Sequence, residues 1–151
     1  MVELNIDSKD LQDNIENVCK ILIPEMVQKA LKETAMIIEA EVKELLVNAP
    51  EEWQDEDEDE EIRKAIFSEV KKNSCTVGSN TILAIYCHQG TGLHAVNNDG
   101  RKEVPWYWYS EKDKKTKSSS GRNPYPFLTK AVENKKEEIL KSFILKQGAS
   151  E

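Results

Sequence analysis

The most regular pattern of apolar and polar positions lies between Pro24 and Leu46. Apolar residues recur there at spacings of three and four, and lysine and glutamate occupy most of the positions between them. This spacing places one apolar stripe along an α-helix of about six turns. Ala49-Pro50 ends the pattern, because the residue before a proline is disfavoured in helical backbone. The predicted apolar face consists of Val27, Ala30, Leu31, Ala35, Ile38, Val42, Leu45 and Leu46.

A shorter amphipathic stretch precedes this helix. It begins at Ser8, and its apolar positions are Leu11, Ile15, Val18 and Leu22. Pro24 has no backbone N–H and disfavours helical backbone at Ile23, so we expect a kink or a short break there. The two stretches together predict a long amino-terminal helix that is kinked near Pro24.

After the long helix the pattern changes to short runs of β-branched and aromatic residues. These runs cover residues 65–70, 75–77, 82–87 and 104–109. Turn-forming residues separate them, including the Asp99-Gly100 pair. Runs and turns of this kind predict an antiparallel meander.

The last run, VPWYWY, is the most aromatic part of the chain. Successive side chains of a strand point to opposite faces, so Trp106 and Trp108 share one face and Tyr107 and Tyr109 share the other. We expect one face to lie in the core. The other face is expected either beneath a helix or exposed, as an aromatic patch of the kind that is enriched at protein interfaces.

A second helix is predicted near the carboxyl end. Pro126, Phe127 and Leu128 form its structural motif, because proline pre-sets the backbone of a helix start and Phe127 offers a large ring to bury on the sheet. We expect the helix to fray after Lys146. The order helix, helix, strands, helix predicts an α+β fold. Residues 1–151 are expected to form a single domain, with the long helix and the carboxyl-terminal helix packed on a small antiparallel sheet.

Charge is distributed unevenly along the chain. The sequence has 28 acidic and 21 basic residues, and nine of the eleven residues from 51 to 61 are acidic. Like charges repel and only Trp53 offers surface to bury, so residues 51–61 are predicted to form a flexible loop. A second flexible loop is predicted at residues 110–122, which are rich in lysine and serine and carry a positive net charge.

Neither a membrane span nor an export signal is visible in the sequence. No run approaches the roughly 18 apolar residues that a span needs, so no membrane partner is expected. The amino-terminal residues lack the basic and apolar regions of a secretory signal, so we expect the chain to stay in the cytoplasm. The three cysteines, Cys19, Cys75 and Cys87, are expected to be free, reduced and mostly buried.

Cys87, His88 and His94 are the residues most suggestive of metal or catalytic chemistry. On the predicted strand, Cys87 and His88 would point to opposite faces, which disfavours a shared zinc ion or a nucleophile–base pair. Gly90-Thr91-Gly92 lacks the longer glycine pattern of a phosphate-binding loop, and we interpret it as a turn that needs positive φ angles. We therefore expect no metal, no cofactor and no enzymatic activity.

Five short motifs follow one another in the second half of the chain. They are VGSN (77–80), ILAIY (82–86), GTG (90–92), PWYWY (105–109) and PYPFLTKAVENKKEEIL (124–140). In this order and spacing they resemble the tail-completion, or head-tail joining, family of siphophages and prophages. His88 and Gln89 stand where that family usually has an acidic and an aromatic residue.

The resemblance implies a non-enzymatic virion-assembly protein at the head-tail junction. It implies a homo-oligomeric ring in the virion, a monomer or weak oligomer in the host cytoplasm, and binding to other phage neck and tail proteins. The glycine turn, the tryptophan face and the basic loop are the expected contact regions. Their residues are Gly90, Thr91, Gly92, Trp106, Trp108, Lys112, Lys114, Lys115, Lys117 and Arg122.

A small nucleic-acid-binding protein is the alternative function from another class. The lysines and arginine of residues 110–122 suit the neutralisation of phosphates, and the aromatic strand lies next to them in the sequence. The genome passes through the channel of a phage neck, so non-specific contact with DNA is compatible with either function.

Overall fold

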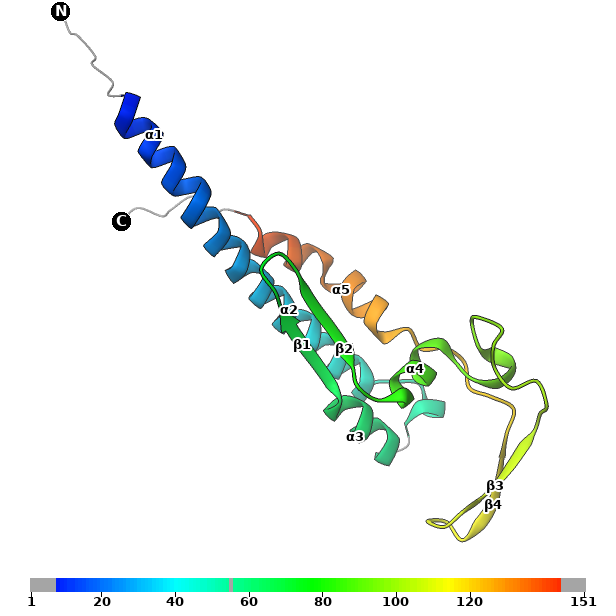
Figure 1. The fold of residues 1–151 in the computed structure, drawn as a ribbon. Helices are drawn as coiled ribbons and strands as arrows, with labels where there is room; N and C mark the ends of the chain where they lie inside the picture. Colours follow the sequence, from blue (N-terminus) through cyan, green and yellow to red (C-terminus); the bar gives the residue numbers. More distant parts are fainter. Residues whose placement is uncertain (1–7, 55, 145–151) are drawn as a thin grey trace, which may run out of the picture.

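The computed structural model describes residues 8–54 and 56–144 (Figure 1). The chain begins with helix α1 (Ser8–Asn17), a π-helical turn (Val18–Leu22) and helix α2 (Ile23–Val47). A 3₁₀ turn (Glu51–Trp53), helix α3 (Glu56–Lys64) and strands β1 (Ile66–Val70) and β2 (Cys75–Ser79) follow. The remaining elements are helix α4 (Ile82–Gln89), a 3₁₀ turn (Gly92–His94), strands β3 (Trp106–Ser110) and β4 (Lys115–Ser119), and helix α5 (Phe127–Ser142).

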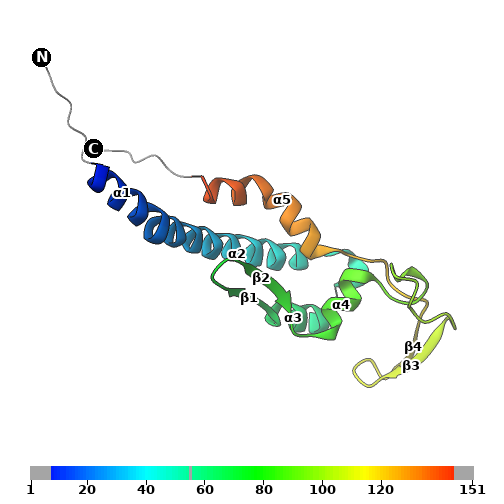
Figure 2. The same ribbon diagram turned by 45° about the horizontal axis from the view of Figure 1, so that its top comes forward.

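The molecule is elongated and is organised around α2. Helix α5 packs along one side of α2, and the β1–β2 hairpin packs on the other (Figures 1 and 2). Helices α3 and α4 lie near the carboxyl end of α2. The β3–β4 hairpin projects from that same end, opposite to α1 (Figure 1). The predicted α+β class is confirmed.

The strands form two separate antiparallel hairpins, and the predicted single sheet is wrong in this respect. β1 pairs with β2, and β3 pairs with β4. Helix α5 packs mainly on α2 and joins it through a polar contact, in which Asn134 Nδ2 donates to Glu41 Oε1 at 2.8 Å. The two long helices therefore form the frame to which the hairpins are attached.

The chain remains helical through Pro24, so of the two alternatives, a kink or a short break, the break is wrong. Ile23 has helical backbone angles (φ −64°, ψ −48°), and its N–H bonds to the carbonyl of Val18. Because Pro24 offers no N–H, the ordinary bond to the carbonyl four residues earlier cannot form there. The backbone accommodates the proline by widening the preceding turn into a π-helix, a local irregularity that leaves the helix continuous.

The hydrophobic core lies where α2, α4 and α5 meet. Val42 and Leu46 of α2, Cys87 of α4 and Phe127 of α5 are the largest fully buried side chains. The ring of Phe127 meets that of His88 edge to face, with 5.4 Å between their centroids. The predicted burial of Phe127 at a proline-led helix start is confirmed, and Leu128 packs against the same core.

The segment 82–87 was expected to be a strand but forms helix α4. The Thr81 hydroxyl accepts a hydrogen bond from the backbone N–H of Leu83, which caps the helix start. Ala84 and Cys87, three residues apart, are the buried positions, which is helical spacing. A short apolar run of this length fits a strand and a buried helix equally well by periodicity, so the sequence pattern was ambiguous.

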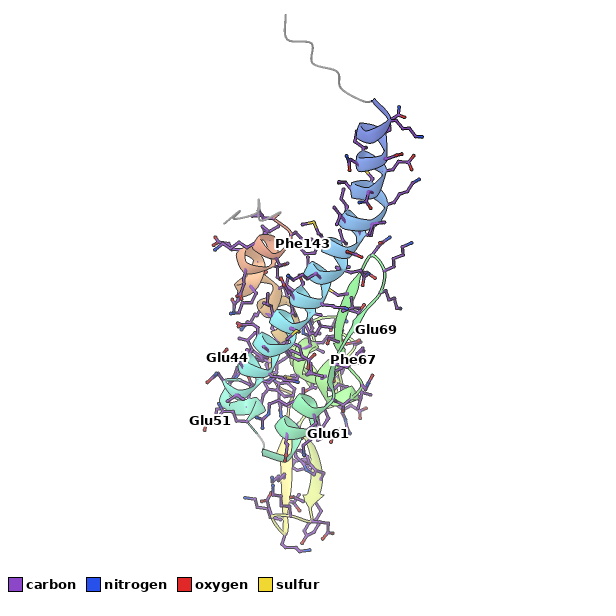
Figure 3. The ribbon with its side chains drawn as sticks, turned by 90° about the vertical axis from the view of Figure 1, so that its left-hand side faces the viewer. Glu44, Glu51, Glu61, Phe67, Glu69 and Phe143 are labelled. Carbon is purple, nitrogen blue, oxygen red and sulfur yellow. The ribbon has the colours of Figure 1, made fainter. Side chains whose placement is uncertain are left out.

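Residues 51–61 contain helical elements where a loop was predicted. They form the 3₁₀ turn and most of α3, with a gap in the description at residue 55. Trp53 is buried and its indole N–H donates to the carbonyl of Asn123 at 2.8 Å, while Ile62 is buried at the other end of α3. Figure 3 shows Glu51 and Glu61 near the same end of α2. Burial of Trp53 and Ile62 thus offsets the repulsion between the carboxylates of this segment.

Residues 110–122 contain strand β4 instead of a flexible loop. Trp106 pairs with Ser119 and Ser110 pairs with Lys115, and Lys114 makes the tight turn with a φ of 52°. The expectation that one face of the aromatic strand lies in the core is wrong, because every residue of β3 is exposed or only half-buried.

The three cysteines were expected to be free and mostly buried. All three thiols are free, but only Cys87 is buried, so the expected burial is wrong for Cys19 and Cys75.

Replacing Phe127 with alanine is expected to lower the free energy of unfolding by about 3–5 kcal/mol, because it empties the centre of the core. Phe143, which is 44% exposed, provides the matched control. Its replacement with alanine should cost about 1 kcal/mol or less. Urea denaturation followed by circular dichroism measures both values, and equal losses for the two variants would contradict this description of the core.

Candidate functional site

A groove with a volume of about 560 Å³ lies between α4, the Gly90–Gly92 turn and the root of the β3–β4 hairpin. Four aromatic side chains line it: Trp53, Tyr86, Trp106 and Trp108. Two arginines, Arg101 and Arg122, line it as well. Aromatic side chains beside arginines are typical of surfaces that bind proteins.

The glycine turn forms one wall of the groove and is joined to the segment after β4. The N–H of Thr91 donates to the carbonyl of Arg122 at 2.9 Å, and the N–H of Arg122 donates to the Thr91 hydroxyl at 3.0 Å. The N–H of Leu93 donates to the carbonyl of Ser120 at 3.2 Å. These bonds fix the root of the hairpin relative to α4.

Gly90 and Gly92 have positive φ angles of 77° and 60°, as expected for this turn. A Cβ atom at residue 92 would lie 2.4 Å from the carbonyl oxygen of Ser120, which is far inside contact distance. The two backbones therefore approach each other so closely that no side chain fits between them. Glycine is required at this position by both the φ angle and the space.

Arg122 connects the groove to the acidic segment. Its guanidinium lies 4.9 Å from the centre of the Trp53 ring and 2.5 Å from a carboxylate oxygen of Glu58. A second arginine, Arg101, lies 5.7 Å from the centre of the Trp106 ring. Both arginines are thus held over tryptophan rings at distances suited to cation–π attraction.

The structure divides the predicted contact residues into two groups. Gly90, Thr91, Gly92, Trp106, Trp108 and Arg122 all line the groove. The four lysines lie outside it, in or near the distal turn of the hairpin. Two of these lysines have carboxylate partners on the same hairpin: Lys114 pairs with Glu111, and Lys117 pairs with Asp113. The hydrogen bond from Lys117, helped by one from Ser110, lowers the pKa of Asp113.

Sequence reasoning missed several contributors to the groove, among them Trp53, Glu58 and Arg101. Trp53 had a recognisable signal, because a lone tryptophan within an acidic run needs a place to be buried. The roles of Glu58 and Arg101 depend on which segments meet in space, and nothing in the local pattern distinguishes either residue from its charged neighbours.

One face of the β3–β4 hairpin is aromatic and uncharged. Tyr107 is 70% exposed and Tyr109 is 54% exposed. Their partners across the hairpin are Ser118 and Thr116. Tyrosine surrounded by small hydroxyl residues is a combination that protein-binding surfaces favour, since it provides contact area with few rotatable bonds.

Cys87 and His88 lie on a helix, so the earlier argument from strand geometry does not apply to them. Cys87 is 1% exposed and belongs to the core. His88 Nδ1 is buried, and it has no hydrogen-bond partner among the described residues. Burial lowers the pKa of His88 below its ordinary value of 6.5. Within the described residues, no three His, Cys, Asp or Glu side chains are grouped so that they could hold a metal ion.

No family of known proteins, no curated protein and no solved structure matches the chain at a significant level. Among the described helices, none is both long and apolar enough to cross a membrane.

Gly92→Ala is expected to destabilise the fold by at least about 1–3 kcal/mol, the cost of forcing a side chain into left-handed backbone. Gly78→Ala is the matched control, because the nearest atoms to its added Cβ are 3.5 Å away on the Phe67 ring. Thermal unfolding compares the two variants. A Gly92→Ala protein as stable as Gly78→Ala would show that the close approach at Ser120 is incorrect.

The lowered pKa of His88 predicts a pH-dependent stability. The unfolded chain protonates this imidazole at a higher pH than the folded chain does, so its contribution is fully present above about pH 6.5 and is lost as the pH falls from there through the lower pKa of the folded chain. His88→Gln should flatten the decline in stability below about pH 6.5. Urea denaturation of both proteins across this range tests the prediction, and parallel curves would contradict it.

Proposed function

We propose that this chain is a structural virion-assembly protein of a tailed phage or prophage. It acts at the head-tail junction, as a tail-completion or neck component, by binding other proteins. Its partners are other neck and tail proteins and further copies of itself, which form a ring in the virion. The free chain is a monomer or weak oligomer in the host cytoplasm until it assembles.

The observation that carries the proposal is the physical connection between the motifs of the resemblance. The GTG turn is hydrogen-bonded to Ser120 and Arg122, just before the PYPF motif. The N–H of Tyr125, within PYPF, donates to the carbonyl of Cys87 in α4 at 2.8 Å. These contacts join the GTG turn, helix α4 and the PYPF motif in one substructure, which is the arrangement that a common role of the motifs requires.

The exposed surfaces support a binding function. The groove and the tyrosine face of the hairpin together offer tryptophan, tyrosine and arginine, the residues that dominate the binding energy of protein interfaces. Cys87, the nucleophile candidate nearest a histidine in sequence, is enclosed in the core. Binding alone is sufficient for the proposed role, and no chemical step is part of it.

The contacts of the hairpin lysines favour this function over nucleic-acid binding. Lys114 and Lys117 already have carboxylate partners, and the exposed tyrosines have uncharged cross-strand neighbours. A phosphate-binding surface gains affinity from unneutralised cations, and that affinity falls steeply with salt. Binding of the purified protein to duplex DNA at low salt, lost as salt rises, would favour the competing function.

Disruption of the gene in its own phage or prophage tests the proposal directly. Electron microscopy of the resulting particles should show full heads beside separate, finished tails, because the joining step fails. Supplying the chain in trans should restore joined virions. Normal joined virions in its absence would refute a role at the junction.

A further inference from the structure

The first part of the long helix projects beyond the rest of the fold. Helix α5 ends beside the middle of α2, where the hydroxyl oxygens of Thr34 and Ser142 lie 3.4 Å apart. The long helix continues past this point toward its amino end (Figures 1 and 2). Every side chain from residue 12 to residue 26 is exposed. We call residues 12–26 the helical extension.

The helical extension carries a strip of large apolar side chains. The strip consists of Ile15, Val18, Leu22 and Met26. Spacings of three and four keep these residues on one side of a helix. Each of them is between 43% and 53% exposed. Most of the stability of a protein helix comes from packing of its apolar side and not from its own propensity, so the strip needs a partner.

A second groove, with a volume of about 400 Å³, adjoins the strip where the end of α5 meets α2. Met26 belongs to both the strip and the groove, and the exposed Phe143 and Ile144 line the groove from the end of α5. Figure 3 shows Phe143 in this place, beside the long helix. A stable interface buries about 800 Å² on each partner, so a stable contact has to use the strip and the groove together.

The charges beside the strip and the second groove are complementary. Residues 12–17, at the far end of the helical extension, contain Asp13 and Glu16 and no basic residue. The lining of the groove contains two lysines, Lys29 and Lys141, and one glutamate. A parallel pair of extensions in register would place each acid beside the same acid of the other copy. An antiparallel pair places the acids beside the lysines, and such complementarity fixes the orientation of a contact.

The same charges disfavour a lipid surface as the partner. The helical extension has three acids and one lysine. Helices that lie on membranes are rich in lysine and arginine on their polar side, which attracts them to anionic lipids. A second copy of this chain, in contrast, offers both an apolar groove and lysines at the position that the acids reach.

We propose that two copies of this chain pair antiparallel, with the apolar strip of each copy seated in the second groove of the other. Val18 of one copy then lies against Met26 of its partner, which brings Glu16 beside Lys29. Both copies use the same surface, so the contact closes on itself as a twofold dimer. This dimer is a form of the free chain and does not rest on the proposed function. A closed pair does not propagate, so a ring in the virion uses other surfaces.

Sedimentation velocity across a range of protein concentrations tests the dimer. The wild-type chain should dimerise. Val18→Glu combined with Leu22→Glu should associate at least about tenfold more weakly, a difference of about 1.4 kcal/mol, because it places carboxylates in an apolar contact. Val47→Glu combined with Val132→Glu is the matched control and should dimerise like the wild type. Both valines are exposed and lie outside the strip and the second groove. Circular dichroism verifies that both variants are folded.

Disulfide formation between copies tests the antiparallel orientation. Cys19 is exposed, so it is first replaced by serine in every variant. An equimolar mixture of the Val18→Cys and Met26→Cys proteins should give a linked dimer on mild oxidation, seen on a non-reducing gel. Neither protein alone should do so, because eight residues separate the two thiols by about 12 Å along the helix, well beyond the reach of a disulfide.

Three results would each overturn the dimer. They are a wild-type chain that stays monomeric, a Val18→Glu and Leu22→Glu protein that associates like the control, and linkage of the single-cysteine proteins that is no greater in the mixture than alone. None of them changes what disruption of the gene does to virions. Failure of the dimer and failure of the proposed function are therefore distinguishable.

Discussion

The rest of the structure depends on the close approach of two backbone segments, residues 90–93 and 120–122. Thr91 and Leu93 bond to Arg122 and Ser120, and a side chain at Gly92 would collide with the Ser120 carbonyl. This contact closes the loop that carries the β3–β4 hairpin. It also directs the chain into α5, whose first residue is the buried Phe127. The groove, the hairpin and the helix start all derive their positions from it.

Burial of a few apolar side chains and local ion pairs hold the two charged segments, residues 51–61 and the β3–β4 hairpin, in their folded conformations. Trp53 and Ile62 hold an acidic segment that would otherwise repel itself, and Arg122 neutralises one of its carboxylates. In the hairpin, Lys114 and Lys117 pair with acids of the same turn. Many charged side chains therefore lie on helices and strands, which hold them in fixed positions. A fixed arrangement of charge binds a complementary partner more tightly than a flexible one, because less conformational freedom is lost on binding.

Sequence patterns predicted the helices well and the short elements poorly. Helices α2 and α5 carry apolar stripes over many residues, and proline marks both ends of α2 and the start of α5. The run 82–87 is too short for its period to be recognised, so its helical state depends on the Thr81 cap and the core above it. Of the candidate site, the glycine turn, both tryptophans and Arg122 were identified, while Trp53, Glu58 and Arg101 were not. These three contribute through contacts across the fold, which local patterns do not encode.

The sequence by itself determined the α+β class, the long helix, the proline-led start of α5 and the need for glycine in the 90–92 turn. Each of these follows from local stereochemistry or from a period sustained over several turns. Only the tertiary structure decided that the strands form two hairpins, that the acidic segment contains helical elements and that the aromatic strand projects from the body. Those outcomes depend on which surfaces are buried against which. That choice is made by the packing of residues distant in sequence, such as Trp53 against Asn123 and Thr91 against Arg122.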